Sequence, residues 1–329
     1  MIELAVPVVL APLAGGPSTP ELAAAVSNAG GLGFVAAGYL SAEALAEQLR
    51  RTRELTSAPF GVNLFALHDA SVDDGAIARY AEELAPEAEL YAVELGEPRF
   101  DDDDFAAKLD LVVSERIPVV STTFDSPPAE LVERVHGAGG EVWATITSPQ
   151  EAREACEAGA DALVVQGTEA GGHRGSFSDD GDAPGPPLLE LLQSVDAEVP
   201  LIGTGGIMDA ADARAALDAG ATAIQAGTAF LLCPEARTSE AHRRALDAGG
   251  TTALTRAFTG RQARGILNEF MRAHPSAPRA YPHVHHLTAP LRAAARAAGD
   301  AQRINLWAGT GFSRARALPA SEVVARLRP

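Results

Sequence analysis

The sequence predicts an α/β fold: a (β/α)8 TIM barrel that carries a smaller, mainly helical substrate-capping domain. Short apolar runs rich in β-branched residues alternate with helical patterns, which is typical of a parallel sheet. Eight such runs occur by residue 228, and this number favours a closed barrel over an open doubly wound sheet. Two runs begin with the same Gly-Ala-x-Ala pattern, at Gly159 and Gly220, as a repeating β/α unit would.

The eight strands are expected where apolar runs end at glycine, proline or polar turn residues. Their expected ranges are 4–13, 32–37, 60–65, 118–124, 142–146, 161–166, 200–207 and 222–228. Helices fill the intervals between them. Ser18 or Thr19 is the expected cap of the first helix, with Pro20 in its first turn and a glycine stop at Gly30.

The pattern changes after Pro234, and this change sets the predicted domain bounds. We expect the barrel over 1–235, with an acidic excursion towards the cap at 70–110. The cap follows over 236–306, and 307–329 returns to the barrel, with an amphipathic helix over 321–327. The run Asp101 to Asp104 is expected to be a solvated face or turn rather than a metal cluster.

Composition excludes several classes of function. The chain has 329 residues, 47% of them hydrophobic, which is ample for one large barrel. Its formal net charge of -18 argues against nucleic acid and anionic membranes as partners, because both need a basic face. Two cysteines without CxxC spacing indicate free thiols, and no targeting or membrane-spanning segment is recognised. We expect a cytoplasmic protein with a small-molecule partner, and leave a homodimer open.

The segment from Asp161 to Gly175 is the strongest candidate for chemistry. A buried strand ends at Gln166 and opens into a glycine-rich loop that contains His173. Histidine changes charge near neutral pH, and α/β barrels carry their active sites at the carboxyl ends of the strands. Asn63 is a second polar strand-end residue, which either binds a ligand or makes a structural hydrogen bond.

Two glycine turns after the last two strands predict a phosphate site. Thr204-Gly205-Gly206-Ile207 precedes one helix and Gly227-Thr228 follows the next strand. Backbone N–H groups and the Thr228 hydroxyl would hold the dianion there. Plain tight turns are the alternative. For His283-Val284-His285-His286, a loop or packing role is favoured over a metal site, because no carboxylate or cysteine is nearby.

These segments resemble the nitronate monooxygenase (2-nitropropane dioxygenase) family, FMN-dependent TIM barrels with a smaller substrate-binding domain. The matching stretches are 11–16, 61–65, 167–175, 203–207, 225–236 and 306–309. The piece from Glu169 to Gly175 is specific for the superfamily but not for one activity, since FMN-dependent enoyl-acyl-carrier-protein reductases carry a similar loop.

The resemblance implies FMN at the barrel mouth and His173 as the catalytic residue. The cofactor-binding residues that it implies are Leu13, Ala14, Asn63, Gln166, Gly171, Gly172, Gly205, Gly206, Gln225, Gly227 and Thr228. The implied reaction is oxidative denitrification of alkyl nitronates to carbonyl compounds and nitrite with O2. His173 would remove the C–H proton of a neutral nitroalkane, or act as hydrogen-bond or charge partner of a nitronate anion.

The chain departs from the family pattern at several positions. Leu13 stands where methionine is usual, Thr310 replaces a glutamine, and the strand containing Thr122 and Thr123 lacks the second histidine of many bacterial members. Two alternatives therefore remain. One is an NAD(P)H-dependent reductase of the same fold, acting on an enoyl thioester or a quinone, and the other is a non-catalytic flavin-binding protein.

Overall fold

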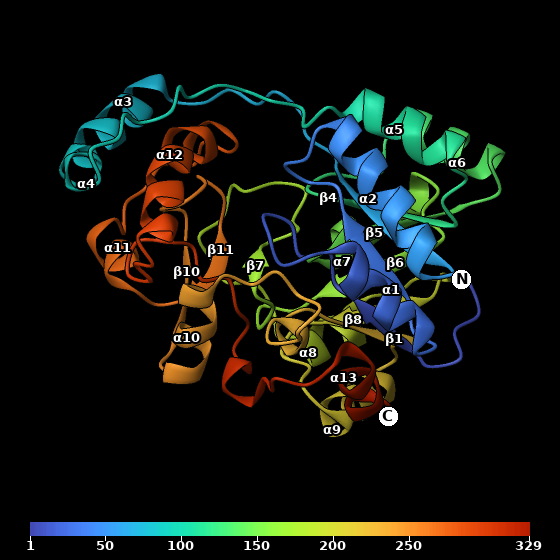
Figure 1. Cartoon of the computed structure of the whole chain (residues 1–329). Coiled ribbons are helices and arrows are strands. Elements are labelled where there is room, and N and C mark those ends of the chain that lie inside the picture. Colours follow the sequence, from blue (N-terminus) through green and yellow to red (C-terminus); the bar gives the residue numbers. More distant parts are fainter.

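The computed structural model describes residues 1–329 and contains an eight-stranded parallel barrel (Figure 1). Its strands are β1 (Val8–Leu10), β2 (Gly33–Ala36), β3 (Phe60–Phe65), β4 (Val119–Thr123), β5 (Glu141–Ile146), β6 (Ala162–Gln166), β8 (Leu201–Thr204) and β9 (Ala223–Ala226). They are ordered β1-β9-β8-β6-β5-β4-β3-β2. A parallel bridge between Val9 and Leu32 joins β1 to the β2 end and closes the ring. The predicted barrel and all eight strand positions are confirmed.

Helices cover the outside of the barrel. They are α1 (Pro20–Asn28), α2 (Ala42–Leu55), α5 (Phe105–Ser114), α6 (Ala129–Gly137), α7 (Pro149–Glu157), α8 (Leu188–Ser194), α9 (Ala210–Asp218) and the C-terminal α13 (Ala320–Leu327), which packs on α1. Thr19 caps α1 by accepting from Leu22 N at 3.0 Å, whereas Ser18 accepts from Leu13 N at 2.9 Å. None of the helices combines the length and the apolar composition that crossing a bilayer requires.

Alternate side chains of the strands build two separate cores. The larger cluster includes Val35 and Leu64 and contacts the helices, while a smaller one includes Val9, Phe34 and Trp143. Because neighbouring residues of a strand point to opposite faces, the second cluster fills the barrel interior. Trp143 is completely buried there, with its ring 5.9 Å from that of Phe34. The interior below the strand ends is therefore packed and leaves no channel through the barrel.

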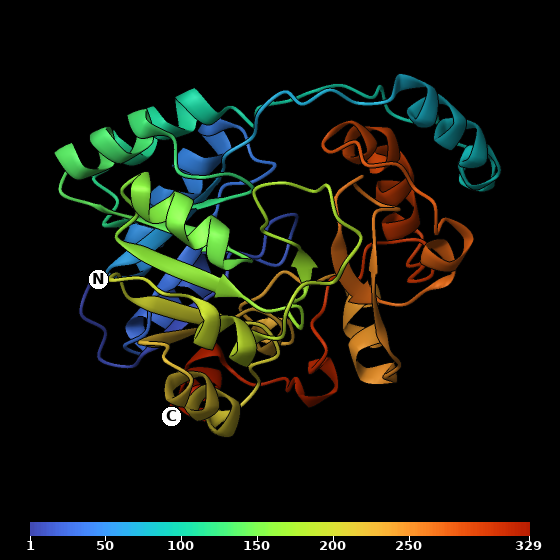
Figure 2. The same ribbon diagram turned by 180° about the vertical axis from the view of Figure 1, so that it is seen from behind.

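A second group of elements, here called the second layer, lies beside the barrel mouth (Figures 1 and 2). It consists of the antiparallel sheet β10 (Thr252–Thr255), β11 (Ala263–Ile266) and β7 (Gly172–His173), and the helices α3 (Asp74–Glu83), α4 (Ala85–Leu90), α10 (Glu240–Ala248), α11 (Glu269–Ala273) and α12 (His283–Ala297). Its own hydrophobic cluster joins Ile77 and Tyr80 of α3 to Phe258 and Leu287. The bounds expected for the barrel, the cap and the C-terminal segment stay predictions.

One local prediction was wrong, and a second holds only in part. The loop after β6 contains strand β7, whose residues Gly172 and His173 pair with Arg264 and Ala263 of β11. Asp103 is not simply solvated: its carboxylate lies 2.7 Å from Nζ of the buried Lys108 and accepts from Tyr39 N at 2.7 Å. Asp103 and Asp104 form the predicted turn before α5.

Candidate active site

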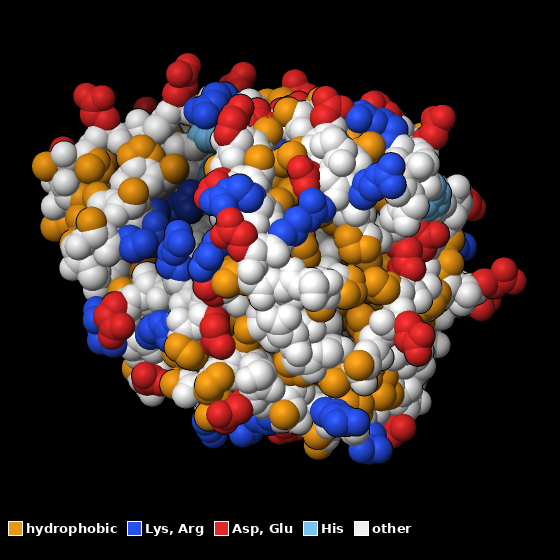
Figure 3. All heavy atoms as spheres, turned by 45° about the vertical axis from the view of Figure 1, so that its right-hand side comes forward, with side chains coloured by type: hydrophobic (Ala, Val, Ile, Leu, Met, Phe, Trp, Pro, Cys, Tyr) orange, Lys and Arg blue, Asp and Glu red, His pale blue; other side chains and the backbone are white.

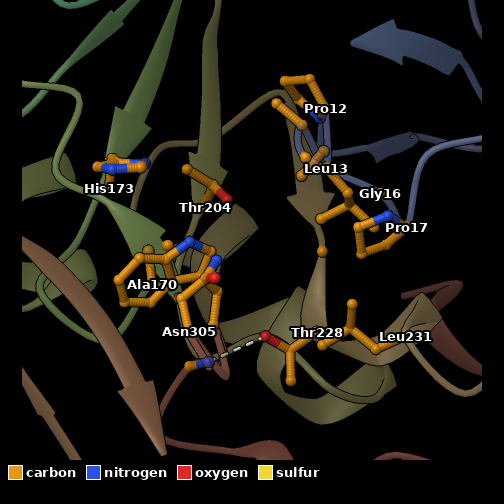
Figure 4. Close-up of a pocket in the computed structure, with 18 of the residues that line it drawn as sticks. Pro12, Leu13, Gly16, Pro17, Ala170, His173, Thr204, Thr228, Leu231 and Asn305 are labelled. Carbon is orange, nitrogen blue, oxygen red and sulfur yellow. Dashed lines mark hydrogen bonds between the residues drawn. The ribbon is translucent and has the colours of Figure 1, made fainter. Parts of the chain in front are cut away.

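A cavity of about 590 Å³ lies between the carboxyl ends of the barrel strands and the second layer. All twelve predicted site residues line it, from Leu13 and Ala14 after β1 to Thr228 after β9. Figure 4 shows Pro12, Leu13, Gly16 and Pro17 on one side of this space and Ala170 and His173 on the opposite side. The structure therefore brings together residues that are more than two hundred positions apart in the sequence.

Several glycines allow close backbone packing at one end of the cavity. Gly205 and Gly206 have φ of +122° and +74°, which favours glycine. A Cβ on Gly171 would lie 2.4 Å from Gly309 N. Gly309 N in turn donates to Thr228 Oγ1 at 3.0 Å, the bond drawn in Figure 4. The Thr228 hydroxyl proton stays available to a ligand oxygen, so this end can bind an anionic group through N–H and O–H donors.

Two strand-end amides present unpaired polar atoms to the cavity. Asn63 donates from Nδ2 to Ser121 Oγ at 2.9 Å and to Thr123 Oγ1 at 3.0 Å, so the structural hydrogen bond expected as the alternative is present. Its Oδ1 has no partner in the protein. Neither amide atom of Gln225, which is buried, makes a hydrogen bond within the protein. Buried polar atoms need partners, so both side chains are suited to the polar edge of a ligand.

Gln166 holds the loop that contains His173 instead of offering a free amide. Its Nε2 donates to the His173 carbonyl at 3.1 Å, and its Oε1 accepts from Gly175 N at 2.9 Å. Arg174 supports the same turn by donating from Nη1 to the Gln166 carbonyl at 3.1 Å. Gln166 therefore lines the cavity with its amide already engaged on both sides.

His173 is held between the two layers with its ring among aromatic side chains. Its Nε2 lies 2.9 Å from Thr259 Oγ1, and its ring centroid lies 5.8 Å from that of Phe124 and 5.5 Å from that of Trp307. Burial, reinforced by the positive charges of Arg261 and Arg292, lowers the pKa of His173 to about 3. The imidazole is therefore neutral at physiological pH, and its Nδ1 makes no hydrogen bond to the protein.

An aromatic wall closes the cavity near His173. Tyr39 stacks on His285, with centroids 4.2 Å apart and an interplanar angle of 2°, and Tyr281 Oη donates to Tyr39 Oη at 3.2 Å. Burial, followed by the nearby Arg292, lowers the pKa of His285 to about 2. The predicted packing role of the histidine run is confirmed for His285, although the run begins helix α12 rather than a loop. No group of His, Cys, Asp or Glu is suited to hold a metal ion.

The cavity wall carries positive charge only. It includes Arg237, Arg292 and Arg296 but no aspartate or glutamate, although the chain has 44 acidic residues. Arg292 is buried, and it donates from Nε to Thr288 Oγ1 at 3.0 Å and from Nη2 to the His285 carbonyl at 2.9 Å. On one face of the molecule, arginine side chains gather around a hollow (Figure 3). This wall favours anionic ligands.

Sequence reasoning missed these arginines, the Tyr39–Tyr281 pair and Thr259. Arg292 and Arg296 follow an ordinary helical pattern, which is typical of solvated surface arginines as well. The position of Tyr39 could have been predicted, because this residue comes three positions after strand β2 and therefore lies at the same edge of the barrel as Asn63. Thr259 lies in the β10–β11 connection, and only the second-layer sheet brings it to His173.

Comparison with known proteins extends over the whole chain. A family model described as nitronate monooxygenase matches residues 1–329. A nitronate monooxygenase of Pseudomonas aeruginosa is 41% identical, with 98% of this chain and 95% of that protein covered. One of Paraburkholderia phytofirmans is 40% identical, with 98% and 91% covered. The solved structure of a nitroalkane oxidase from Streptomyces ansochromogenes is similar with a TM-score of 0.96 and 48% identity, covering 98% of this chain and 95% of that one. These likenesses span the barrel, the second layer and the cavity between them.

Proposed function

The chain belongs to the nitronate monooxygenase family, and on this premise we propose that its cavity binds FMN together with a nitronate anion that contacts His173. The protein is an oxidoreductase that acts on nitronates. We propose the full reaction as oxidative denitrification, in which an alkyl nitronate and O2 give a carbonyl compound and nitrite. A cytoplasmic location and a homodimer stay predictions.

Three features of the cavity support FMN as the cofactor. Its volume of about 590 Å³ is in the range of cofactor sites. Gly205, Gly206, Gly227 and Thr228 line the same cavity, and the backbone is closely packed there, since a Cβ on Gly227 would lie 3.0 Å from Leu13 Cδ2. The free amide atoms of the strand ends are suited to a heterocycle with donors and acceptors along one edge.

We assign the cofactor contacts accordingly. The phosphate would bind to the N–H groups of Gly205, Gly206 and Gly227 and to the Thr228 hydroxyl. Asn63 Oδ1 and the Gln225 amide would bind the polar edge of the flavin ring. The backbone near Leu13, Ala14, Gly171 and Gly172 would contact the rest of the cofactor. Gln166 would act indirectly, by fixing the loop that carries His173. When bound, FMN supplies the one-electron chemistry that connects the nitronate to O2.

The charge state of His173 indicates whether the substrate binds as the nitronate anion or as the neutral nitroalkane. A histidine with a pKa near 3 is a weak base, so it is poorly suited to removing the C–H proton of a neutral nitroalkane. Direct binding of the nitronate anion is therefore favoured, with the imidazole as a neutral hydrogen-bond partner. The positive charge comes instead from the buried Arg292, which the cavity wall leaves without a carboxylate partner.

The visible absorbance of the purified protein tests the proposal. We expect a flavin spectrum, bleaching of that spectrum when an alkyl nitronate is added without oxygen, and nitrite and a carbonyl product once O2 is admitted. Rapid bleaching by NADPH with indifference to nitronates would contradict the proposal in favour of a reductase. A flavin spectrum without turnover of nitronates, enoyl thioesters or quinones would indicate a non-catalytic flavin-binding protein.

A further inference from the structure

Tyr39 is fixed in the cavity wall through both its backbone and its ring. It follows strand β2 with φ of 68°, a left-handed conformation that is uncommon for a residue with a side chain and persists where the surroundings hold it. Its N–H donates to Asp103 Oδ1 at 2.7 Å, and Oδ2 of that carboxylate lies 2.7 Å from Nζ of the buried Lys108. Its ring stacks on His285, with centroids 4.2 Å apart, and meets the ring of Phe65 edge-on at 5.3 Å. The place of its hydroxyl is therefore set by three separate segments of the chain.

The Tyr39 hydroxyl has a proton that no group of the protein accepts. Tyr281 Oη donates to Tyr39 Oη at 3.2 Å, which leaves the O–H of Tyr39 free. Tyr39 lines the cavity, whereas Tyr281 does not, so only the Tyr39 proton can reach a ligand there. Burial raises the pKa of Tyr39 to about 12, and the hydroxyl therefore keeps its proton at physiological pH.

The groups already assigned to the substrate lie close to this hydroxyl. Arg292 Nη2 is 3.3 Å from Nδ1 of His285, the ring on which Tyr39 stacks. Tyr281, which donates to Tyr39, has its ring centroid 5.7 Å from that of His173. A nitronate has two oxygen atoms that share one negative charge, and each can accept more than one hydrogen bond. Contacts with His173 and Arg292 therefore leave acceptor sites for a further donor.

We propose that Tyr39 is a catalytic residue whose hydroxyl donates a hydrogen bond to an oxygen of the bound nitronate. A hydrogen bond from O–H to a charged oxygen is stronger than one between neutral groups, so this contact favours the anion over the neutral nitroalkane. Tyr281 supports the donor, because the hydrogen bond that Tyr39 accepts polarises the one that it donates. The inference rests on the proposed function and adds a residue that contacts the reacting group.

Tyr39→Phe tests the inference, because it removes the hydroxyl and keeps the ring that stacks on His285. With flavin-loaded protein and a preformed alkyl nitronate, we expect KM to rise roughly tenfold or more. The contact is made with the bound anion and is largely kept as the reaction proceeds, so kcat should stay within about threefold. The ratio of flavin to protein absorbance should not change. Tyr91→Phe is the matched control, because the Tyr91 hydroxyl donates to Asp300 outside the cavity, and it should alter neither constant.

Two further variants separate the donor from its support. Tyr281→Phe keeps the Tyr39 hydroxyl and should raise KM by less than about threefold, because only the polarising bond is lost. Tyr39→Phe leaves the Tyr281 hydroxyl without its acceptor, which can destabilise the fold by itself. The double variant Tyr39→Phe/Tyr281→Phe removes both hydroxyls, so it should be more stable than Tyr39→Phe and show the same rise in KM.

Nitrate provides a second readout that does not depend on turnover. It is a planar anion whose oxygen atoms are bonded to nitrogen, as in a nitronate, and its affinity can be measured by calorimetric titration of the purified protein. We expect this affinity to fall about tenfold in Tyr39→Phe and to stay unchanged in Tyr91→Phe.

An unchanged KM for nitronates in Tyr39→Phe would overturn the inference. A larger rise in KM in Tyr281→Phe than in Tyr39→Phe would also overturn it, because Tyr281 would then be the donor. If the wild type oxidises no nitronate, the proposed function fails, and the nitrate titration decides the inference separately. Weaker nitrate binding in Tyr39→Phe would then support the donor, and equal binding would overturn it.

Discussion

His173 Nε2 lies 2.9 Å from Thr259 Oγ1, and this contact joins the loop after β6 to the connection between β10 and β11. The Thr259 hydroxyl has one proton, which it donates to the Arg261 carbonyl at 3.4 Å. Its oxygen is then the acceptor of an Nε2–H bond from His173. This arrangement favours the neutral tautomer in which Nδ1 carries a lone pair, and it fixes the plane of the ring.

Replacement of Thr259 by valine should lower kcat/KM for nitronates by about tenfold, since a hydrogen bond of this kind contributes about 1 kcal/mol and leaves a buried donor unpaired when lost. Thr259→Ser keeps the hydroxyl and should keep most of the activity. Nitrogen NMR of the imidazole reports the tautomer directly: a single Nε2–H form in the wild type and a mixture in the valine variant are expected. An unchanged tautomer in the valine variant would remove the positioning role.

The pH dependence of turnover tests the charge state of His173. Burial shifts the pKa from 6.5 to about 3, so the ring loses its proton at low pH and stays neutral as pH rises. With preformed nitronate, kcat/KM should therefore show no histidine titration between about pH 5 and 8, where an ordinary histidine would titrate. A step near pH 6.5 that disappears in His173→Asn would contradict this. Neutral nitroalkanes should be turned over far more slowly than preformed nitronates by the wild type, because a histidine with a pKa near 3 is a weak base for the C–H proton.

The barrel could be predicted from the sequence because its strands and helix ends depend on residues that are close together in the chain. Each buried strand is a short apolar run, and Thr19, Pro20 and Gly30 mark the ends of α1 by side-chain capping and backbone conformation. Strand β7 could not be predicted in this way. It has two residues, and its pairing partner Ala263 lies ninety positions away, so only tertiary contacts with β11 define it.

The residues of the candidate site fall into the same two groups, those placed by local sequence and those placed by tertiary contacts. Its glycines and strand-end amides follow directly after strands, so the barrel topology alone brings Asn63, Gly205 and Gly227 together. Thr259, Tyr281 and Arg292 come from second-layer connections and helices whose packing depends on contacts distant in sequence. Gln166 illustrates a third limit, because its position was predictable but the two hydrogen bonds that engage its amide were not.

Gly171→Ala should reduce the flavin content of the purified protein. The added Cβ would lie 2.4 Å from Gly309 N and 2.5 Å from the Ala308 carbonyl carbon, so the Trp307–Gly309 segment must move away from Thr228. We expect the ratio of flavin to protein absorbance to fall by at least half, with a smaller loss of folded protein. Gly137→Ala is the control, because a Cβ at this helix end meets nothing within 4 Å. Full flavin content in Gly171→Ala would contradict the assigned cofactor cradle.

Lys108, the single lysine of the chain, should be a strong determinant of stability. It is 1% exposed, and its Nζ lies 2.7 Å from the Asp103 carboxylate, which also accepts from the backbone N–H of Tyr39. Lys108→Met leaves that carboxylate without its cation, and loss of one partner of a buried ion pair costs about 3 kcal/mol. The free energy of unfolding from urea titrations should fall by about this amount.

The double variant Asp103→Asn/Lys108→Met separates charge from packing. Asn keeps an acceptor for Tyr39 N–H and tolerates the left-handed backbone at this position, where φ is 60°. It removes the uncompensated charge, so the double variant should be more stable than Lys108→Met alone. Arg50→Met, which removes an exposed cation paired with Glu47 and Glu54, should change stability by less than about 1 kcal/mol. If Lys108→Met proved no more harmful than Arg50→Met, the stabilising role assigned to the buried pair would be wrong.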